Sequence, residues 1–485
     1  MRARLGDETG TLFSDSPERI ALVYPSPYRT GMSSLGFQTI YRVIHERGRN
    51  AERAFLPDDV EAWKRSRLPL LTYESQRPVS DFPVVALSVA YEIEIAGLIQ
   101  CLELSGIPPL AEDRNERHPL VLCGGPLTFS NPLPLAPYAD AVLMGECDES
   151  IHIALDVALE GGSRRTVLEA LARALPSAFV PSIHGDEMPE VEKADLCKLP
   201  AWGPIRTPHT ELRDMFLIEA ERGCSRGCKY CVMRRSTNGG MRIVPMETIL
   251  GLIPDDAKRV GLVGAAVSDH PKIADIVETL ADQGRGVGLS SLRPDRLNDR
   301  FVAALKKGGY RTLTTASDGA SQRLRDQMQR KAQERHLVRA AELTRAHGLE
   351  RMKLYMMVGL PDEVDEDIDE LVQFGIGLSK IAPISLGIAP FVSKRNTPLD
   401  GMPFAGIKLV EQRMDRLRRG VKGRVDIRAT SARWAWIEWV LAQGGRPEGR
   451  AVLDAVHAGG RFADWKRAFE ALPAMRTKRS LSVVA

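Results

Sequence analysis

Short apolar runs alternate with amphipathic stretches along the first part of this 485-residue chain. Each apolar run ends in a loop rich in Gly, Pro or Ser, and a segment with apolar positions at helical spacing follows. The predicted strands are 20–24, 84–89, 120–123 and 141–144, and the clearest helices are 34–47 and 93–105. Strands that alternate with helices predict an α/β fold with a parallel, doubly wound, Rossmann-like sheet. Such sheets bind ligands at the carboxyl ends of their strands.

A second alternating region follows a polar, Pro-containing stretch at 191–212, which we interpret as a linker. The strands predicted there are 215–220, 260–267, 287–292, 312–316, 352–358 and 384–391. The helices predicted between them include 272–283, 297–307, 331–347 and 365–379. Six strand–helix units predict a partial (β/α)6, TIM-like barrel, with its active groups at the carboxyl ends of the strands.

From about residue 404 the pattern becomes helical, and Trp434, Trp436, Trp439 and Trp465 concentrate there. We therefore predict four parts: a Rossmann-like domain at 1–190, a linker at 191–212, a partial barrel at 213–403 and a helical C-terminal cap at 404–485.

Composition and charge exclude several classes of protein. Lys and Arg (66) nearly balance Asp and Glu (63), so a net charge of +3 gives no argument for nucleic-acid binding. No apolar run reaches the roughly 18 residues that span a bilayer, and the N-terminus has no apolar signal core. Seven cysteines, an odd number without a secretion signal, indicate a reducing compartment, so we expect a cytoplasmic location.

Three of the cysteines stand close together as Cys-x3-Cys-x2-Cys: Cys224, Cys228 and Cys231. They come directly after the first strand of the predicted barrel, in a loop rich in Gly, Ser, Arg and Lys. A [4Fe–4S] cluster has four irons and normally four thiolates. Three thiolates leave one iron open for a substrate or cofactor, so the motif indicates chemistry at the cluster rather than plain electron transfer.

Other interpretations of the three cysteines are weaker. Cysteines scattered at random would give this spacing with a probability on the order of one in a thousand. A structural zinc site needs a fourth ligand, and neither Cys197 nor His209 has the spacing of a partner. Buried structural cysteines do not gather in so polar a loop.

The loop resembles that of the radical S-adenosylmethionine (SAM) superfamily, whose signature is Cys-x3-Cys-x-aromatic-Cys, with Tyr230 as the aromatic residue. The resemblance covers about residues 18 to 475. It implies that Cys224, Cys228 and Cys231 hold a [4Fe–4S] cluster and that the open iron chelates SAM. One electron then cleaves SAM to methionine and a 5′-deoxyadenosyl radical.

The resemblance also implies cofactor-binding positions at the strand ends, with Tyr230 among them. Ala265 and Ala266 stand where many members carry Gly-Gly-Glu, but no Glu is present, so only backbone groups are expected to serve there. Ser291 falls in the third-strand segment and Gly359 in the fifth. Asp318, in the fourth, is expected either to contact SAM or to cap a helix. No catalytic side chain can be named.

The first domain resembles the B12-binding domain that precedes the barrel in one branch of this superfamily. Gly124-Gly125-Pro126 and Gly145-Glu146 fit its strand-end motifs. The Asp-x-His-x-x-Gly motif, which supplies an axial histidine, is absent, because 25–31 contains no His. Either cobalamin binds without a protein histidine, or the pocket has another use.

The resemblance implies a radical SAM enzyme and, if cobalamin is bound, a transferase that methylates an unactivated carbon. One alternative is cobalamin-independent chemistry such as RNA methylthiolation, for which Cys101, Cys123 and Cys147 would be the additional ligands. Another is a cluster-bearing RNA-binding or sensor protein without turnover. The substrate class is open between RNA, a peptide and a small molecule. The expected electron donor is a flavodoxin or ferredoxin, and no membrane partner is expected.

Overall fold

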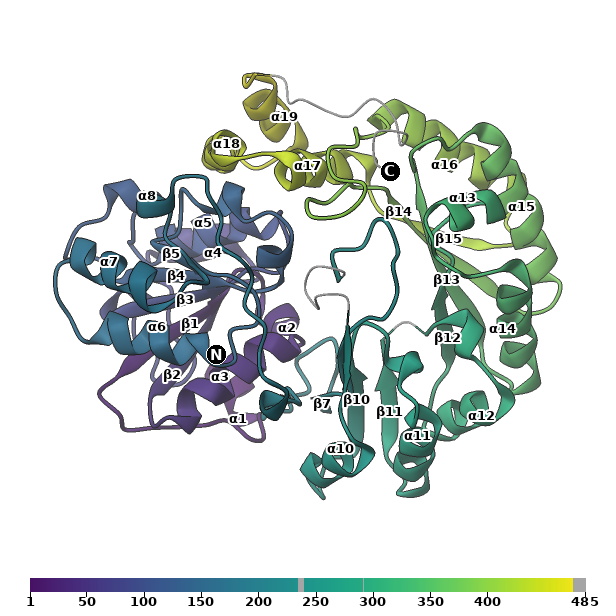
Figure 1. The fold of residues 1–485 in the computed structure, drawn as a ribbon, viewed down its shortest axis with the longest axis horizontal. Coiled ribbons are helices and arrows are strands. Elements are labelled where there is room, and N and C mark those ends of the chain that lie inside the picture. Colours follow the sequence, from purple (N-terminus) through teal and green to yellow (C-terminus); the bar gives the residue numbers. More distant parts are fainter. Residues whose placement is uncertain (234–239, 291, 474–485) are drawn as a thin grey trace. The chain divides into compact units, whose positions relative to one another are not determined.

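The computed structural model describes residues 1–233, 240–290 and 292–473. The chain forms two compact units. The first comprises Met1–Phe216 and the C-terminal segment that begins at Gly444, and the second is Leu217–Gln443. Both units are built from strands and helices that alternate along the chain (Figure 1).

The first unit contains a single six-stranded sheet. Its strands are β1 (Arg19–Tyr24), β2 (Asn50–Phe55), β3 (Val84–Ser88), β4 (Leu120–Gly124), β5 (Ala141–Leu143) and β6 (Ala178–Phe179). Its helices are α1 (Arg2–Gly6), α2 (Tyr28–Gly31), α3 (Leu35–Glu46), α4 (Val60–Ser66), α5 (Glu94–Leu104), α6 (Ser150–Leu159), α7 (Arg164–Ala174), α8 (Pro181–His184), α18 (Arg446–His457) and α19 (Phe462–Glu470). The prediction of a Rossmann-like sheet is confirmed.

The strand order is β2-β1-β3-β4-β5-β6, with parallel pairing from β2 to β5 and an antiparallel β6. The chain leaves β1 toward β2 on one side and returns to β3 on the other. Because such crossovers are right-handed, the connecting helices cover both faces of the sheet. This is the doubly wound order whose ligand crevice lies at the carboxyl ends of β1 and β3.

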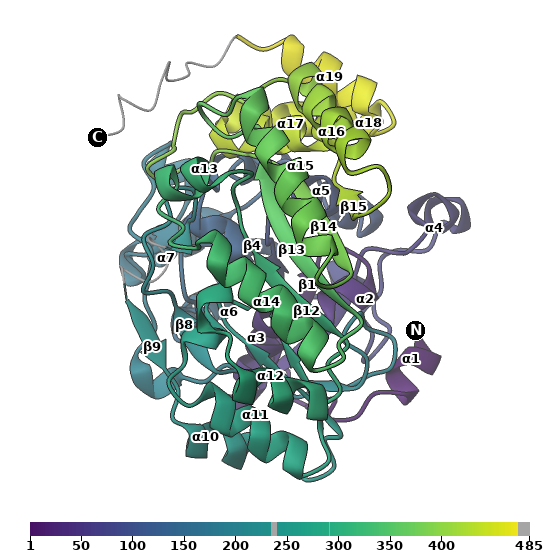
Figure 2. The same cartoon turned by 90° about the vertical axis from the view of Figure 1, so that its right-hand side faces the viewer.

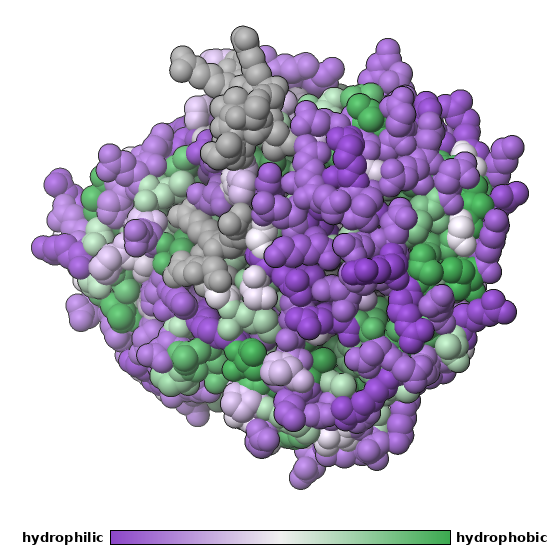
Figure 3. Space-filling model, turned by 45° about the vertical axis from the view of Figure 1, so that its right-hand side comes forward, coloured by the Kyte–Doolittle hydropathy of each residue, from purple (hydrophilic) through white to green (hydrophobic). Residues whose placement is uncertain are grey.

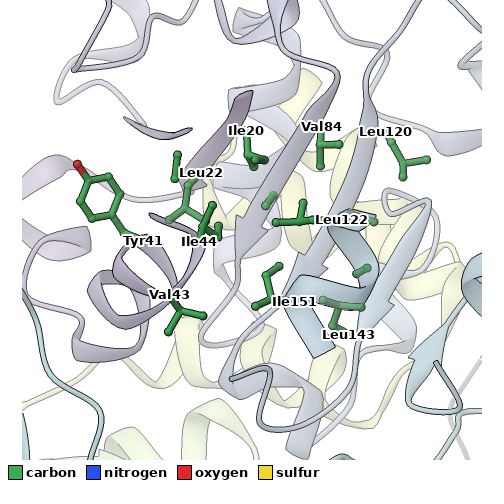
Figure 4. Packing of buried hydrophobic residues seen from close by; sticks show 14 of the residues in the cluster. Ile20, Leu22, Tyr41, Val43, Ile44, Val84, Leu120, Leu122, Leu143 and Ile151 are labelled. Atoms are coloured by element: carbon green, nitrogen blue, oxygen red, sulfur yellow. The ribbon is translucent and has the colours of Figure 1, made fainter. Parts of the chain in front are cut away.

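The core of this unit is the apolar side chains of the strands packed against the flanking helices. Ile20, Leu22, Val84, Leu122 and Leu143 are all less than 4% exposed. Figure 4 shows them converging with residues of α3 and α6. Strands buried on both faces need continuous apolar sequence, which is the pattern that predicted β1, β3, β4 and β5.

The strand β2 was not predicted from its sequence, Asn-Ala-Glu-Arg-Ala-Phe, although every one of its residues is buried. Its polar side chains are paired. Arg53 bonds Glu8 at 2.7 Å and Glu74 at 2.6 Å, and Glu52 accepts a bond from Thr72 at 2.7 Å. These partners lie far away in the sequence, so the apolar pattern could not reveal the strand.

The second unit contains a row of neighbouring strands: β7 (Met215–Glu219), β10 (Arg259–Val263), β11 (Gly286–Leu289), β12 (Thr312–Ala316), β13 (Arg351–Val358), β14 (Ile384–Pro390) and β15 (Asp426–Ala429). A short hairpin adds β8 (Glu221–Gly223) and β9 (Met241–Ile243). The helices are α10 (Met246–Leu252), α11 (Ile273–Asp282), α12 (Asp299–Lys307), α13 (Gln322–Gln327), α14 (Glu334–Ala346), α15 (Asp365–Ser379), α16 (Ile407–Val421) and α17 (Ala432–Gln443).

These strands form two sheets, β7-β10-β11 and β12-β13-β14-β15. The parallel bridge between Leu292 and Thr315 continues the row from one to the other. Figure 2 shows α11, α12, α14 and α15 covering one side of the strands. The six predicted strand–helix units are therefore present. The region after 404 is not wholly helical, because β15 adds a seventh strand parallel to β14.

The structure also divides the chain differently from the four predicted parts. The segment 191–212 belongs to the first unit, where Glu192 bridges to Gly145 and Arg206 to Thr9. The predicted C-terminal cap is split, because α18 and α19 pack in the first unit. The Tyr138 hydroxyl there donates to the Gly449 carbonyl at 2.6 Å.

Polar and charged side chains dominate the face of the molecule in Figure 3, with apolar residues in scattered groups. Among the described residues, no helix is both long and apolar enough to cross a membrane.

Candidate cluster and cofactor site

The cysteine loop begins at a short hairpin after the first strand of the second unit. Strands β8 and β9 pair antiparallel, with Gly223 opposite Met241. The Cys224 N–H donates to the Gly240 carbonyl at 3.2 Å, which closes the base of the loop. Gly223 adopts φ +104°, a conformation that favours glycine. The hairpin thus places the first cysteine at the end of the strand pair.

The three cysteines form one partly buried group of free thiols. Cys228 is 6% exposed, and Cys224 and Cys231 are half-buried. Burial, with a smaller contribution from the charges of Cys228 and Cys224, raises the pKa of Cys231 to about 11. The thiols are therefore within electrostatic reach of one another, as ligands of one cluster must be.

A single metal ion fits this group less well than a cluster does. Among the described residues, no three His, Cys, Asp or Glu side chains converge closely enough to hold one ion. Thiolates that bind a [4Fe–4S] cluster reach different irons and need not converge on a point. No cysteine follows Cys231 in the sequence, so the loop offers three thiolates. This donor set fits a [4Fe–4S] cluster with one open iron.

On one side the loop is anchored by an ion-pair network. Arg226, between the first two cysteines, contacts Asp269 at 3.2 Å and Asp295 at 3.3 Å. Arg293 and Arg296 contact Asp269 as well, at 3.4 and 3.0 Å. Burial alone would raise the pKa of Asp269, but the hydrogen bond from Arg226 and the charge of Arg293 hold it below its ordinary value. The loop is thereby tied to the segments that follow β10 and β11.

On the other side the loop is anchored to the segment after β12. The Tyr230 hydroxyl donates to Asp318 Oδ2 at 2.7 Å, and Arg330 Nε contacts the same oxygen at 2.5 Å. The Lys229 N–H donates to the Met328 carbonyl at 3.1 Å. The structure thus brings Tyr230 and Asp318 together with the cysteine loop.

Asp318 does not cap a helix. The N-cap of α13 is Ser321, whose hydroxyl accepts from the Leu324 N–H at 3.3 Å. Asp318 instead has φ +61°, in the left-handed region that non-glycine residues seldom adopt. That conformation turns its carboxylate toward Tyr230 and Arg330. The helix-capping alternative is therefore wrong.

A buried carboxylate that the sequence did not reveal lies at the end of β10. Glu221 is fully buried, and its Oε1 accepts from the Ala266 N–H at 2.6 Å. Gly264 leaves room for it, because a Cβ there would lie 2.3 Å from Glu221 Oε1. Glu221 Oε2 has no hydrogen-bond partner. Burial raises the pKa of Glu221 to about 7, with Ala266 opposing and Glu219 adding to the rise.

This geometry changes the expectation for the second strand. Of the two alanines predicted to bind the cofactor, Ala265 is exposed, whereas the Ala266 N–H is already bound to Glu221. An acid is thus present at this strand end, but it comes from the strand before the cysteine loop. A search for Gly-Gly-Glu in the sequence could not have found it.

The remaining predicted positions are less closely connected to the loop. Ser291 lies outside the described residues, and the neighbouring Ser290 hydroxyl donates to the Gly264 carbonyl at 3.1 Å. Gly359 is buried at the end of β13 with φ +87°, and its N–H donates to Glu363 Oε1 at 2.8 Å. Ala405 and Val410 lie beside it, so any contact with a cofactor would use its backbone carbonyl.

In the first unit, loops pack closely against one another at the carboxyl ends of the strands. A Cβ on Gly125 would lie 2.7 Å from the Val89 carbonyl oxygen, and one on Gly145 would lie 2.3 Å from that of Glu192. At the crevice between β1 and β3, Glu94 accepts from the Ser26 hydroxyl at 3.0 Å. The glycines therefore allow close contact between loops.

No histidine occurs in the sequence segments 25–31, 89–93, 125–131 and 144–149, which follow β1, β3, β4 and β5. The side chains of these segments include hydroxyls, the Asn131 amide, carboxylates and the Arg29 guanidinium, and together with backbone groups they can bind the amide side chains of a corrin. They offer its cobalt no imidazole ligand.

The other candidate cluster ligands lie in the core of the first unit. Cys101 is in α5 and Cys123 in β4, and both are at most 2% exposed. The Cys147 thiol donates to the carbonyls of Leu143 and Gly145. Burial raises the pKa of Cys123 and of Cys147 to about 12. These are packed thiols, and the structure does not gather them into a metal-binding group.

Comparisons with known proteins agree with this site. The model of the radical SAM superfamily matches residues 218–375, and the model for the N-terminal region of radical SAM proteins matches residues 36–181. An uncharacterised protein of Methanocaldococcus jannaschii is 25% identical over 395 residues, which is 80% of each chain. The chain belongs to the radical SAM superfamily, whose members use a [4Fe–4S] cluster and SAM, and it is a radical SAM enzyme.

Two solved structures share the fold. The radical SAM methyltransferase TsrM from Kitasatospora setae has a TM-score of 0.55 at 13% identity, over 81% of this chain and 76% of that one. The cobalamin-dependent SAM radical enzyme OxsB has a TM-score of 0.50 at 12% identity, over 84% of this chain and 56% of that one. At these identities the likeness establishes the fold, with its B12-type domain before the barrel.

Proposed function

We propose that the chain cleaves SAM reductively at a [4Fe–4S] cluster held by Cys224, Cys228 and Cys231. The observation that carries this proposal is the group of three free thiols, anchored on both sides to strand ends, with no later cysteine to close the cluster. When bound, such a cluster supplies one electron at low potential to the sulfonium of SAM. A flavodoxin or ferredoxin is the proposed donor of that electron.

The buried carboxylate of Glu221 is the proposed acceptor for the ammonium group of SAM. Its Oε2 lacks a partner, and an unpaired buried carboxylate gains most from a cation. Gly264 gives it the space to lie at the end of β10, and the Ala266 N–H orients it. Asp318 already binds Tyr230 and Arg330, so its proposed task is to hold the loop. The predictions for Ala265, Ser291 and Gly359 remain untested.

We further propose that the reaction is methylation of an unactivated carbon with cobalamin as the methyl carrier. Two observations support this: the doubly wound sheet before the barrel, and the likeness of fold over 82% of this chain to TsrM, for which a structure with cobalamin and a [4Fe–4S] cluster is known. Hydroxyl and backbone groups after β1, β3, β4 and β5 would hold the corrin, with no histidine on its cobalt. The substrate, whether RNA, a peptide or a small molecule, remains to be identified.

The burial of Cys101 and Cys123 disfavours RNA methylthiolation. That alternative needs a second set of cluster ligands, and these thiols lie in the core of the first unit. Methylation therefore accounts better for the first unit than methylthiolation does.

The test begins with protein purified without oxygen, on which iron, sulfide and cobalamin are quantified. Dithionite and SAM are then added, and 5′-deoxyadenosine is measured. We expect roughly four irons per chain and formation of deoxyadenosine. Both should be lost in Cys228→Ala and kept in Cys197→Ala, which removes an exposed free thiol.

The outcomes separate the two proposals. A loaded cluster with no deoxyadenosine would contradict the cleavage of SAM. Deoxyadenosine formation by protein that fails to retain added hydroxocobalamin would leave cleavage intact and exclude methylation through a corrin.

A further inference from the structure

Arg330 is a buried cation next to the cysteine loop. It follows α13, and its side chain is 11% exposed. Besides its contact with Asp318, it lies near the side chain of Cys228, which is itself 6% exposed. Burial lowers the pKa of the guanidinium, whereas the charges of Asp318 and Cys228 raise it. A guanidinium therefore lies near one of the three sulfurs proposed to bind iron, in a place where water screens its charge little.

The position of Arg330 is fixed by several contacts. Asp318 Oδ2 takes both Arg330 Nε at 2.5 Å and the Tyr230 hydroxyl at 2.7 Å. Tyr230 lies between Cys228 and Cys231, so one carboxylate holds the cation and the loop together. The Lys229–Met328 backbone bond at 3.1 Å adds a second tie between the same two segments. This arrangement gives the guanidinium little freedom to move away from the sulfur.

The other arginines near the loop differ in their surroundings. Arg226 and Arg293 each face two carboxylates, Asp269 and Asp295. Arg330 shares one carboxylate with Tyr230, and the charge of Cys228 acts on it. Of these cations it is therefore best placed to act on a cluster.

Charge balance determines the direction of the effect. Reduction adds one negative charge to an iron–sulfur cluster, and part of that charge resides on the ligating sulfurs. A cation close to such a sulfur stabilises the reduced form more than the oxidised form. Hydrogen bonds to the sulfurs and local charge are known determinants of the potential of these clusters.

We propose that Arg330 raises the reduction potential of the cluster by its positive charge beside Cys228, with Asp318 and Tyr230 holding it in position. The proposal rests on the binding of a cluster by the three cysteines. It gives this chain a residue that adjusts how readily the cluster accepts its electron, separate from the residues that bind SAM.

The test is a potentiometric titration of the cluster-loaded protein without SAM, followed by the electron paramagnetic resonance signal of the reduced cluster. Arg330→Gln removes the charge and is expected to shift the midpoint potential to a more negative value. Arg330→Lys keeps a charge but loses the planar fork that holds Arg330 on Asp318, so its midpoint should lie between the two. The control is Arg323→Gln, which removes a half-exposed guanidinium of α13 that pairs with Asp367 and should leave the midpoint unchanged.

The results separate this inference from the proposed function. Wild-type protein that binds no cluster would overturn both. A loaded Arg330→Gln variant with an unchanged or more positive midpoint would overturn the role of Arg330 alone, as would an equal shift in Arg323→Gln. If Arg330→Gln does not load a cluster, Arg330→Lys decides, because a midpoint equal to that of wild type would contradict the inference.

Discussion

Replacement of Glu221 by Gln tests the electrostatics of the candidate site directly. Glu221 is fully buried, one of its oxygens has no partner, and its pKa is raised to about 7, chiefly by burial. The change to Gln keeps an oxygen that can accept from the Ala266 N–H and removes the ionisable group. The shape of the site is almost unchanged, so the effect should be that of the charge.

The magnitude follows from the shift of the pKa. The ordinary pKa of a glutamate is 4.5, and that of Glu221 in the folded protein is about 7. Between these two pH values the folded protein therefore binds more protons at Glu221 than the unfolded chain does. The free energy of unfolding from this group is therefore highest below pH 4.5 and falls as the pH rises through 7. The rise of the pKa from 4.5 to about 7 corresponds to roughly 3 kcal/mol, since one pH unit is about 1.4 kcal/mol. The Glu221→Gln variant has no ionisable group at this position, so its free energy of unfolding lacks this fall with rising pH.

The measurement is urea unfolding of the cluster-free protein at about pH 5 and about pH 8, for wild type and Glu221→Gln. The free energy of unfolding of the variant, relative to wild type, should rise by about 2 to 3 kcal/mol between the two pH values. The matched control is Glu247→Gln, an exposed carboxylate on α10, whose difference from wild type should stay within about 0.5 kcal/mol. Parallel pH profiles for wild type and Glu221→Gln would refute the assignment of a charged, costly carboxylate at the end of β10.

Two further predictions concern packing. Arg53→Met leaves Glu8 and Glu74 buried without their cation and should lower the free energy of unfolding of the first unit by about 3–5 kcal/mol in urea unfolding. Arg165→Met, at an exposed pair, should leave it almost unchanged, and similar losses in both variants would contradict the importance of burial. Gly264→Ala places a Cβ 2.3 Å from Glu221 Oε1 and should lower the thermal stability of the second unit by the equivalent of about 1–3 kcal/mol, while Gly251→Ala, which meets open space on α10, should not; equal melting temperatures for Gly264→Ala and wild type would show that Glu221 lies elsewhere.

The apolar pattern predicted most of the fold because most strands here are buried on both faces. Continuous apolar runs such as those of β1, β3 and β4 are recognisable without knowledge of their neighbours. The pattern failed for β2, whose buried polar side chains find partners far away in the sequence, and for β15, whose residues Asp426–Ala429 are partly exposed. In both strands the neighbouring strand, rather than the residues themselves, determines the conformation.

The candidate site, too, could be predicted from the sequence only in part. The cysteine spacing and Tyr230 are local features, and they were sufficient to indicate a cluster and the superfamily. The partners of the loop are not local. Asp318 follows Tyr230 by 88 residues and Ala266 follows Glu221 by 45, so no short motif could join them.

The sequence by itself therefore indicated the cluster ligands, the superfamily and most of the order of strands and helices in both units. Spacing within one short loop and the period of apolar positions carry that information directly. Only the tertiary structure decided which acids and cations surround the loop: Glu221 over Gly264, and Asp318 between Tyr230 and Arg330. The reason is physical, because whether a buried charge is stable depends on groups that folding brings to it from distant segments.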